Sequence, residues 1–169
     1  MMSLRKNMPL LTKNEGVWDG YYRVYNYSGN QIDEHKSRLL CRIIDDTEYH
    51  QTNIYRWKSG QKELRDFPAT IEGNKLVFST YINGWAAEVN LDEHNRTMML
   101  HWERKGEPDL YLYEMIQLSD DGLSRARTWQ WFKKDKLFQR TLIDEIKISD
   151  DWALYDNQDP EYSDIAQNI

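Results

Sequence analysis

The sequence has few of the features that mark disulfide-bonded, secreted or membrane-spanning proteins. Its 169 residues include one cysteine, Cys41, which excludes an intramolecular disulfide. No apolar run approaches the roughly 18 residues that a transmembrane helix needs, and the apolar stretch after Lys6 is shorter than the roughly 7–15 residues of a signal-peptide core. These absences predict a cytoplasmic protein that does not associate with a membrane.

The sequence also lacks an excess of positive charge and the familiar catalytic motifs. It has 22 lysines and arginines against 28 aspartates and glutamates, and the net charge of −6 argues against binding to nucleic acid or anionic lipid. It contains no Gly-x-Ser-x-Gly, no glycine-rich phosphate loop, no His-Glu-x-x-His and no paired cysteines. We therefore expect no metal and no cofactor, while the question of whether the protein is an enzyme stays open.

Aromatic residues are plentiful and lie in short alternating segments separated by turns. They make up 13% of the chain, with 7 Trp, 11 Tyr and 4 Phe. Such segments, recurring every 8–12 residues or so without a sustained helical period, predict an all-β antiparallel meander that closes into a barrel of about 8–10 strands. The expected strands are residues 14–27, 37–44, 48–57, 63–67, 75–81, 85–91, 97–104, 110–118, 123–132 and 137–148.

The chain divides into three expected parts. Residues 1–13 form a loose N-terminal lead-in whose Pro9-Leu10-Leu11 turn caps the barrel, residues 14–148 form the barrel domain, and residues 149–169 form an acidic C-terminal tail. The tail carries six acidic residues and no basic one between Asp150 and Asp164. Its aromatic residues Trp152 and Tyr155 are expected to dock on the barrel wall.

The first strand begins with Gly16-Val17-Trp18, which matches the Gly-x-Trp motif of the lipocalin and calycin superfamily. Longer blocks strengthen the resemblance, namely residues 14–29, 51–57 with Gly60, 125–132 and 140–145. Together they resemble an uncharacterised lipocalin-like family found largely in cyanobacteria and proteobacteria. The resemblance implies a lipocalin-like barrel, but that family has no settled activity to carry over. It also implies a basic residue over Trp18 from the end of the last strand, for which Arg140 and Lys147 are candidates.

The third strand has the clearest period of two, which assigns its side chains to two faces. Gln51, Asn53, Tyr55 and Trp57 are expected to point into the barrel, whereas His50, Thr52 and Arg56 point to water. A barrel of about eight strands encloses room for one small ligand. The residues expected to line the ligand site are Tyr22, Gln51, Asn53, Tyr55, Trp57, Trp85, His101, Glu114, Arg127, Trp129 and Trp131.

Titratable side chains within the strands can face the interior or the solvent, and those that face inward can have a structural or a ligand-binding role. Of the four histidines, His101 lies mid-strand and is expected to reach the interior, whereas His35, His50 and His94 are expected to be solvated. An inward pair among glutamates such as Glu114 and arginines such as Arg127 would be either a structural ion pair or a ligand anchor, because a lone buried charge is costly.

These patterns predict the binding of a small, largely apolar ligand, aromatic or polyene-like, in the barrel cavity. The first alternative is a cofactor-independent isomerase, lyase or cyclase that uses the same cavity, and the second is a protein-interaction module that uses the acidic tail. Residues 125–134 mix basic and aromatic residues, as do platforms for single-stranded nucleic acid, but the net charge argues against that function. A homodimer is left open.

Overall fold

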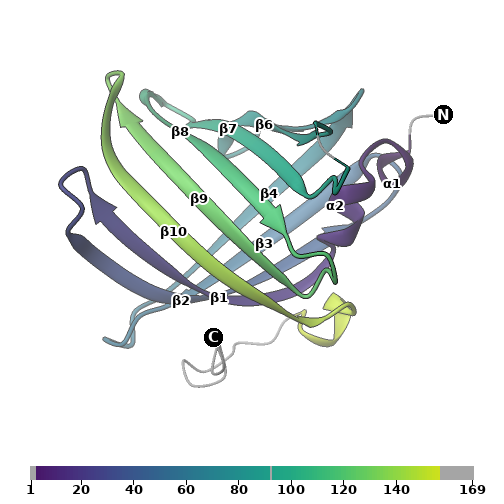
Figure 1. The fold of residues 1–169 in the computed structure, drawn as a ribbon, viewed down its shortest axis with the longest axis horizontal. Helices are drawn as coiled ribbons and strands as arrows, with labels where there is room; N and C mark the ends of the chain where they lie inside the picture. The colour runs from purple at the N-terminus through teal and green to yellow at the C-terminus, as the bar shows by residue number, and fades with distance from the viewer. Residues whose placement is uncertain (1–2, 92, 157–169) are drawn as a thin grey trace.

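The computed structural model describes residues 3–91 and 93–156, and these form a closed barrel of ten antiparallel strands (Figure 1). The strands are β1 (Gly16–Asn26), β2 (Gln31–Ile43), β3 (Glu48–Arg56), β4 (Lys62–Glu72), β5 (Lys75–Phe78), β6 (Ile82–Val89), β7 (Thr97–Arg104), β8 (Glu107–Leu118), β9 (Ser124–Lys133) and β10 (Lys136–Ser149). Each strand pairs with its neighbours in chain order, and β1 pairs with β10 to close the barrel. The predicted all-β meander is confirmed.

The fourth strand is longer than predicted, because Pro68 does not end it. Pro68 lies within β4, opposite His50 of β3, and β4 continues to Glu72. Proline has no N–H to donate, so within a sheet it suits a strand edge without a partner. β5 pairs with β4 only from Thr70 onward, which leaves residues 62–69 of β4 without a second neighbour and makes Pro68 tolerable there.

The N-terminal residues are ordered, which corrects the expectation of a loose lead-in. Two short helices, α1 (Leu4–Asn7) and α2 (Pro9–Lys13), lie at one end of the barrel (Figure 1). Leu4 and Met8 are fully buried in the core, and the Leu11 N–H donates to Glu88 Oε1 of β6 at 2.8 Å. Helices of four and five residues are too short to show a helical period in the sequence. Neither is long and apolar enough to cross a membrane, nor is any other helix in the described ranges.

Trp18 of β1 is fully buried near this closed end. Its Nε1–H donates to the Asn14 carbonyl at 2.9 Å, directly after α2. The Lys147 ammonium of β10 lies 5.3 Å from the ring centroid, and the Arg125 guanidinium of β9 lies closer, at 4.2 Å. Lys147 is therefore the basic residue from the last strand, whereas the other candidate, Arg140, is exposed. The contact from Arg125 was not predicted.

The segment after β10 packs on the outer face of the barrel. Trp152, in the 3₁₀ turn η1 (Trp152–Leu154), and Tyr155 cover an apolar patch of Val17, Leu40 and Ile54 from β1, β2 and β3. This confirms the predicted docking of the tail as far as residue 156. The remainder of the acidic tail, with the interaction function suggested for it, lies outside the described residues.

The same outer face corrects two expectations for β3. Thr52 and Arg56 were expected in water but are buried, at 7% and 6% exposure. The Thr52 hydroxyl donates to Asp66 Oδ1 of β4 at 2.6 Å and accepts from Arg42 of β2 at 2.8 Å. Polar residues on an outer strand face can therefore be covered by neighbouring long side chains, which the period of two does not reveal.

Replacing Trp18 with alanine is expected to lower the free energy of unfolding by about 3–5 kcal/mol, because the loss of a large buried ring leaves a cavity. Chemical denaturation followed by circular dichroism measures the change. The half-buried Trp85 provides the control, and Trp85→Ala should cost much less. A Trp18→Ala protein with the denaturation midpoint of the parent would contradict the packing role of this ring.

Candidate ligand cavity

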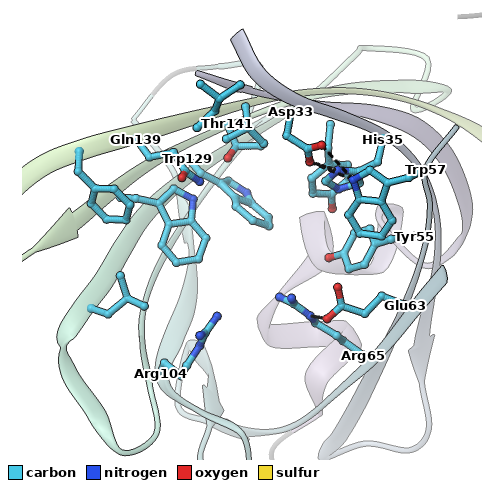
Figure 2. Close-up of a pocket in the computed structure, with 16 residues that line it drawn as sticks. Asp33, His35, Tyr55, Trp57, Glu63, Arg65, Arg104, Trp129, Gln139 and Thr141 are labelled. Atoms are coloured by element: carbon cyan, nitrogen blue, oxygen red, sulfur yellow. Dashed lines mark hydrogen bonds and ion pairs between the residues drawn. The ribbon is translucent and has the colours of Figure 1, made fainter. Parts of the chain in front are cut away.

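The barrel end opposite the two helices holds a cavity of about 380 Å³, here called the end cavity (Figure 2). Six aromatic residues contribute to its wall, namely Tyr22, Tyr55, Trp57, Trp129, Trp131 and Phe138 from β1, β3, β9, β10 and the turn after β3. This volume falls in the range of roughly 300–1,000 Å³ that small-molecule sites occupy. Five residues of the sequence-predicted set thus meet here, namely Tyr22, Tyr55, Trp57, Trp129 and Trp131.

Tyr22 is buried deep in the end cavity and holds its neighbours in place. Its ring stacks on His35 at a centroid distance of 5.1 Å and meets Tyr55 and Trp129 edge-on at 5.3 Å and 5.4 Å. Its hydroxyl accepts from Arg127 Nη1 at 3.1 Å. Burial, chiefly, raises the pKa of Tyr22 well above its ordinary value, so the hydroxyl stays protonated at neutral pH.

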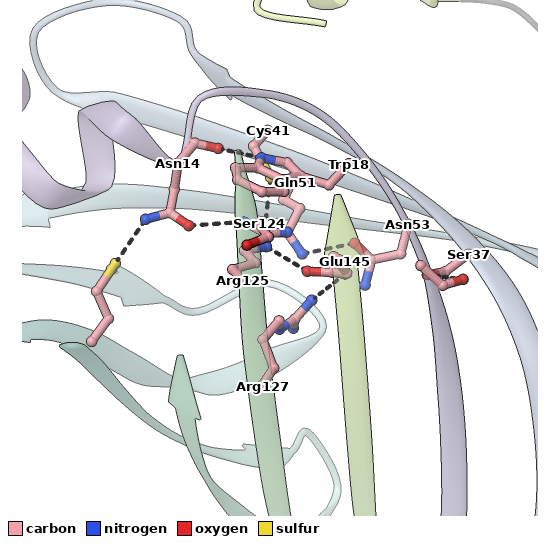
Figure 3. A network of polar contacts seen from close by, with 12 residues as sticks. Asn14, Trp18, Ser37, Cys41, Gln51, Asn53, Ser124, Arg125, Arg127 and Glu145 are labelled. Carbon is pink, nitrogen blue, oxygen red and sulfur yellow. Dashed lines mark hydrogen bonds and ion pairs between the residues drawn. The ribbon is translucent and has the colours of Figure 1, made fainter. Parts of the chain in front are cut away.

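A buried ionic network fills the barrel between Tyr22 and the helices, and part of it is seen in Figure 3. Arg127 donates from Nε to Glu114 Oε1 at 2.5 Å and from Nη1 to Glu145 Oε1 at 3.1 Å. Arg125 donates from Nε to Glu145 and from Nη1 to Asn14 Oδ1 at 2.9 Å. Each of the four charged groups is at most 5% exposed, so two positive and two negative charges balance inside the barrel. Glu114 and Arg127, both predicted site residues, thus form an ion pair with each other below the end cavity.

The inner face of β3 carries a chain of side-chain hydrogen bonds. The Tyr49 hydroxyl donates to Gln51 Oε1 at 2.9 Å, Gln51 Nε2 donates to Asn53 Oδ1 at 2.7 Å, and Asn53 Nδ2 donates to the Tyr55 hydroxyl at 2.8 Å. All four side chains point inward, as the period of two predicted for Gln51, Asn53 and Tyr55. The amides lie deeper than the residues that line the end cavity, and they satisfy one another, which removes the penalty for burying them.

Two residues of the predicted set lie on the outer face of the barrel, and their assignment to the interior was wrong. His101 pairs with Trp85 of β6 and Tyr113 of β8, and its ring centroid lies 4.6 Å from that of Tyr113, which is 45% exposed. Trp102, the next residue along β7, packs in the core. Because successive strand residues face opposite sides, His101 and Trp85 face outward together. Apolar neighbours in sequence, such as Trp102, misled the assignment.

His35 was expected to be solvated but lies in the wall of the end cavity. Its Nδ1 is 2.8 Å from Asp33 Oδ2, and its ring lies 4.4 Å from that of Trp57, whose Nε1–H donates to Asp33 Oδ1 at 3.0 Å. Burial, opposed by Asp33, lowers the pKa of His35 from 6.5, so the ring is neutral near pH 7. A carboxylate only accepts hydrogen bonds, so Nδ1 carries the proton. The spacing Asp33-x-His35 puts both side chains on the same face of a strand and was the signal in the sequence for this pair. It was missed because the predicted strand began at residue 37, whereas β2 begins at Gln31.

A second hollow of about 560 Å³, here called the side opening, lies in the barrel wall between β4 and the pair β6 and β7. It exists because β5 is too short to pair with the first half of β4. Leu64, Phe67, Tyr81 and Trp102 line it together with two arginines, Arg65 and Arg104. Both arginines also line the end cavity, so the two hollows meet at these side chains.

Two donors in the wall of the end cavity have no partner in the part of the chain that the structure describes. The indole nitrogens of Trp129 and Trp131 are buried, and no hydrogen-bond acceptor lies within reach of either among the described residues. Nearly all buried polar groups in proteins are bonded, so two orphan N–H groups beside one cavity need an explanation. The sequence could locate these rings but not reveal that their N–H groups lack partners.

No protein-family model matches the chain, and no curated protein sequence matches it. Several solved structures are similar to it in fold. A Nostoc punctiforme protein of unknown function from the DUF3598 family has a TM-score of 0.66 at 14% identity, with 82% of this chain covered. This chain spans about half of that protein, 49% of its length. The fold is that of a lipocalin-like barrel.

Two further structures match most of both chains. An S-type phycobiliprotein lyase from Guillardia theta has a TM-score of 0.64 at 14% identity, with coverage of 86% of this chain and 93% of the lyase. A protein from M. tuberculosis has a TM-score of 0.61 at 10% identity, with coverage of 83% and 96%. At such low identities the likeness shows the shared barrel alone.

The hydrogen-bond chain on β3 predicts coupling between its amides. Asn53→Leu should cost about 1–3 kcal/mol of unfolding free energy, because it leaves Gln51 Nε2 without an acceptor and Tyr55 without a donor. Gln51→Leu should cost a similar amount, and the double variant should cost less than the sum, because both single variants break the same bond. Urea denaturation of the four proteins tests this. Additive costs would show that the two amides act independently.

The neutral, buried His35 predicts that stability falls at acid pH. The unfolded chain takes up the proton near pH 6.5, whereas the folded protein takes it up only at lower pH, so between these values the unfolded state holds more protons. The free energy of unfolding should therefore decrease as the pH falls from about 7 to about 5. His35→Gln should flatten this slope, because it removes the buried imidazole. Equal slopes in His35→Gln and the parent would contradict the assignment.

Proposed function

We propose that the protein binds one small, largely apolar ligand with an aromatic or polyene body in the end cavity. The observation that carries this proposal is the aromatic wall, with Tyr55 and Trp57 on one side of the space and Trp129 on the other (Figure 2). Rings held at such positions offer both faces and edges to a flat conjugated molecule, and the burial of apolar area supplies most of the binding free energy.

A few polar groups would orient the ligand. The unpartnered N–H groups of Trp129 and Trp131 favour a ligand that carries a hydrogen-bond acceptor, which would reach them after a neighbouring side chain turns aside. The paired amides and ions below Tyr22 are already satisfied by one another, so they are not expected to contact the ligand. Within the predicted set, the proposed contacts are therefore Tyr22, Tyr55, Trp57, Trp129 and Trp131.

The comparisons support a ligand of this kind and guide the choice of probes. One neighbour in fold is, by its name, a phycobiliprotein lyase, which makes an open-chain tetrapyrrole a suitable conjugated probe beside a simple polyene. We also propose that the chain belongs to the lipocalin and calycin superfamily. The partner is then a small molecule, and a cytoplasmic location remains the expectation.

Catalysis on the same ligand is the second candidate, and the Asp33–His35 pair favours it. A neutral imidazole oriented by a carboxylate is the arrangement of a general base, and this pair lines the end cavity. Turnover of a bound isomerisable ligand would then be lost in His35→Gln while binding persists. Binding without any chemical change to the ligand would leave the first proposal alone.

Binding is tested with a variant in which a larger side chain fills part of the end cavity. Thr141 of β10 is 2% exposed and lines it, whereas its neighbour Leu142 lies on the outer face and is 42% exposed. Thr141→Phe should weaken the binding of retinol and biliverdin by roughly ten-fold or more, equivalent to about 1.4 kcal/mol, because its ring takes up ligand space. Quenching of tryptophan emission measures the binding, since three indoles line the cavity.

Leu142→Phe is the matched control, because it puts the same ring on the opposite face of the same strand. It should bind both probes as the parent does. Equal affinities in Thr141→Phe and Leu142→Phe would place binding elsewhere, and the absence of saturable quenching in the parent by any conjugated probe would overturn the proposed function. Circular dichroism confirms that both variants remain folded.

A further inference from the structure

We infer that the ligand carries a carboxylate, which Arg65 and Arg104 bind where the end cavity meets the side opening. This inference rests on the proposed function, and it adds a chemical class, an acidic conjugated molecule. It also adds an orientation, with the apolar body among the rings of the end cavity and the acidic group at the wall between β4 and β7.

The positions of the two arginines follow from strand alternation. On β4, Arg65 shares a face with Phe67, Ala69 and Ile71, of which the last two are buried. On β7, Arg104 shares a face with the buried Met98 and Trp102. The pairing of β7 with β8 shifts in register between Glu103 and Arg104. Both guanidinium groups therefore belong to the inner face, and Figure 2 shows them directed into the space from opposite sides.

The two guanidinium groups have donors to spare. Among the described residues, the hydrogen bond of the Arg65 side chain goes from Nε to Glu63 Oε1 at 2.7 Å, which leaves both terminal nitrogens. Within residues 3–91 and 93–156, Arg104 has one side-chain hydrogen bond, from Nη1 to Glu107 Oε1, at the limiting distance of 3.5 Å. The Arg65 guanidinium also lies 5.7 Å from the Tyr55 ring centroid, which orients it beside the aromatic wall. The planar fork of a guanidinium matches the two oxygens of a carboxylate.

The other charges at this place favour a single negative charge on the ligand. The carboxylates that line the end cavity are already bonded, Asp33 by Trp57 and His35 and Glu63 by Arg65, so they offer little to a cationic ligand. Glu63 beside Arg65 would repel a doubly charged phosphate more than a carboxylate. The side chains of Arg65 and Arg104 are 43% and 44% exposed, so an incoming acid can reach them through the side opening.

The test compares two probes that share one polyene body, retinoic acid and its methyl ester. The parent should bind the acid more tightly than the ester by roughly ten-fold or more, since charge-assisted hydrogen bonds are lost on esterification. Arg65→Gln and Arg104→Gln should each weaken the binding of the acid. The double variant should bind the acid and the ester equally. Arg65→Lys should restore part of the preference. The ester should lose much less affinity than the acid in each of these variants, because it carries no charge for the guanidinium groups to pair with.

Arg140→Gln is the matched control, because it removes the same charge from an exposed site on β10. Its preference for the acid over the ester should equal that of the parent. Added salt should reduce this preference in the parent only moderately. The inference is overturned if the parent binds acid and ester equally, or if the preference for the acid survives in the double variant. In either case, binding of the ester by the parent still upholds the proposed function. If neither probe binds the parent, both proposals fail for this class of ligand. Should the double variant fail to fold, the two single variants decide.

Discussion

The balance of four charges inside the barrel is the constraint on which the rest of the structure depends. Arg125, Arg127, Glu114 and Glu145 are withdrawn from water, and each would cost several kcal/mol if it lost its partner. Their bonds join β8, β9 and β10 to one another, to Asn14 at the end of α2 and to Tyr22 of β1. The network therefore ties the closed end of the barrel to the base of the end cavity.

That arrangement divides the barrel interior along its axis. Toward the helices the space is filled by apolar side chains such as Leu4 and Met8 and by the ionic network. Toward the other end, rings line the wall but do not fill the space, and a cavity of about 380 Å³ remains. Tyr22 touches both regions, because its hydroxyl accepts from Arg127 of the network and its ring packs against Tyr55 in the end cavity.

Strand alternation in the sequence was enough to predict the fold and much of the site, and each wrong assignment of a side chain has a physical cause. The inward face of β3 was assigned correctly for Gln51, Asn53 and Tyr55, because the strand is regular over its length, whereas Thr52 and Arg56 on its outer face were wrongly expected in water. His101 was placed on the wrong face, because the apolar residues on both sides of it obscure which set faces inward. His35 was missed since β2 continues as a regular strand through polar residues that look like a turn. Helices of one turn, and the pairing of Arg125 with Trp18, depend on contacts between distant segments and leave no local pattern.

The shortness of β5 has a consequence for the behaviour of the protein in a crowded solution. It leaves the backbone of the first half of β4 without a neighbour on one side, and such an open edge can pair with a strand from another molecule and start aggregation. This edge carries Glu63, Arg65 and Asp66 in close succession, and Pro68 removes an N–H from it. Charge repulsion and a missing donor both discourage intermolecular strand pairing. The barrel thus keeps an opening in its wall while that edge stays a poor template for a second chain.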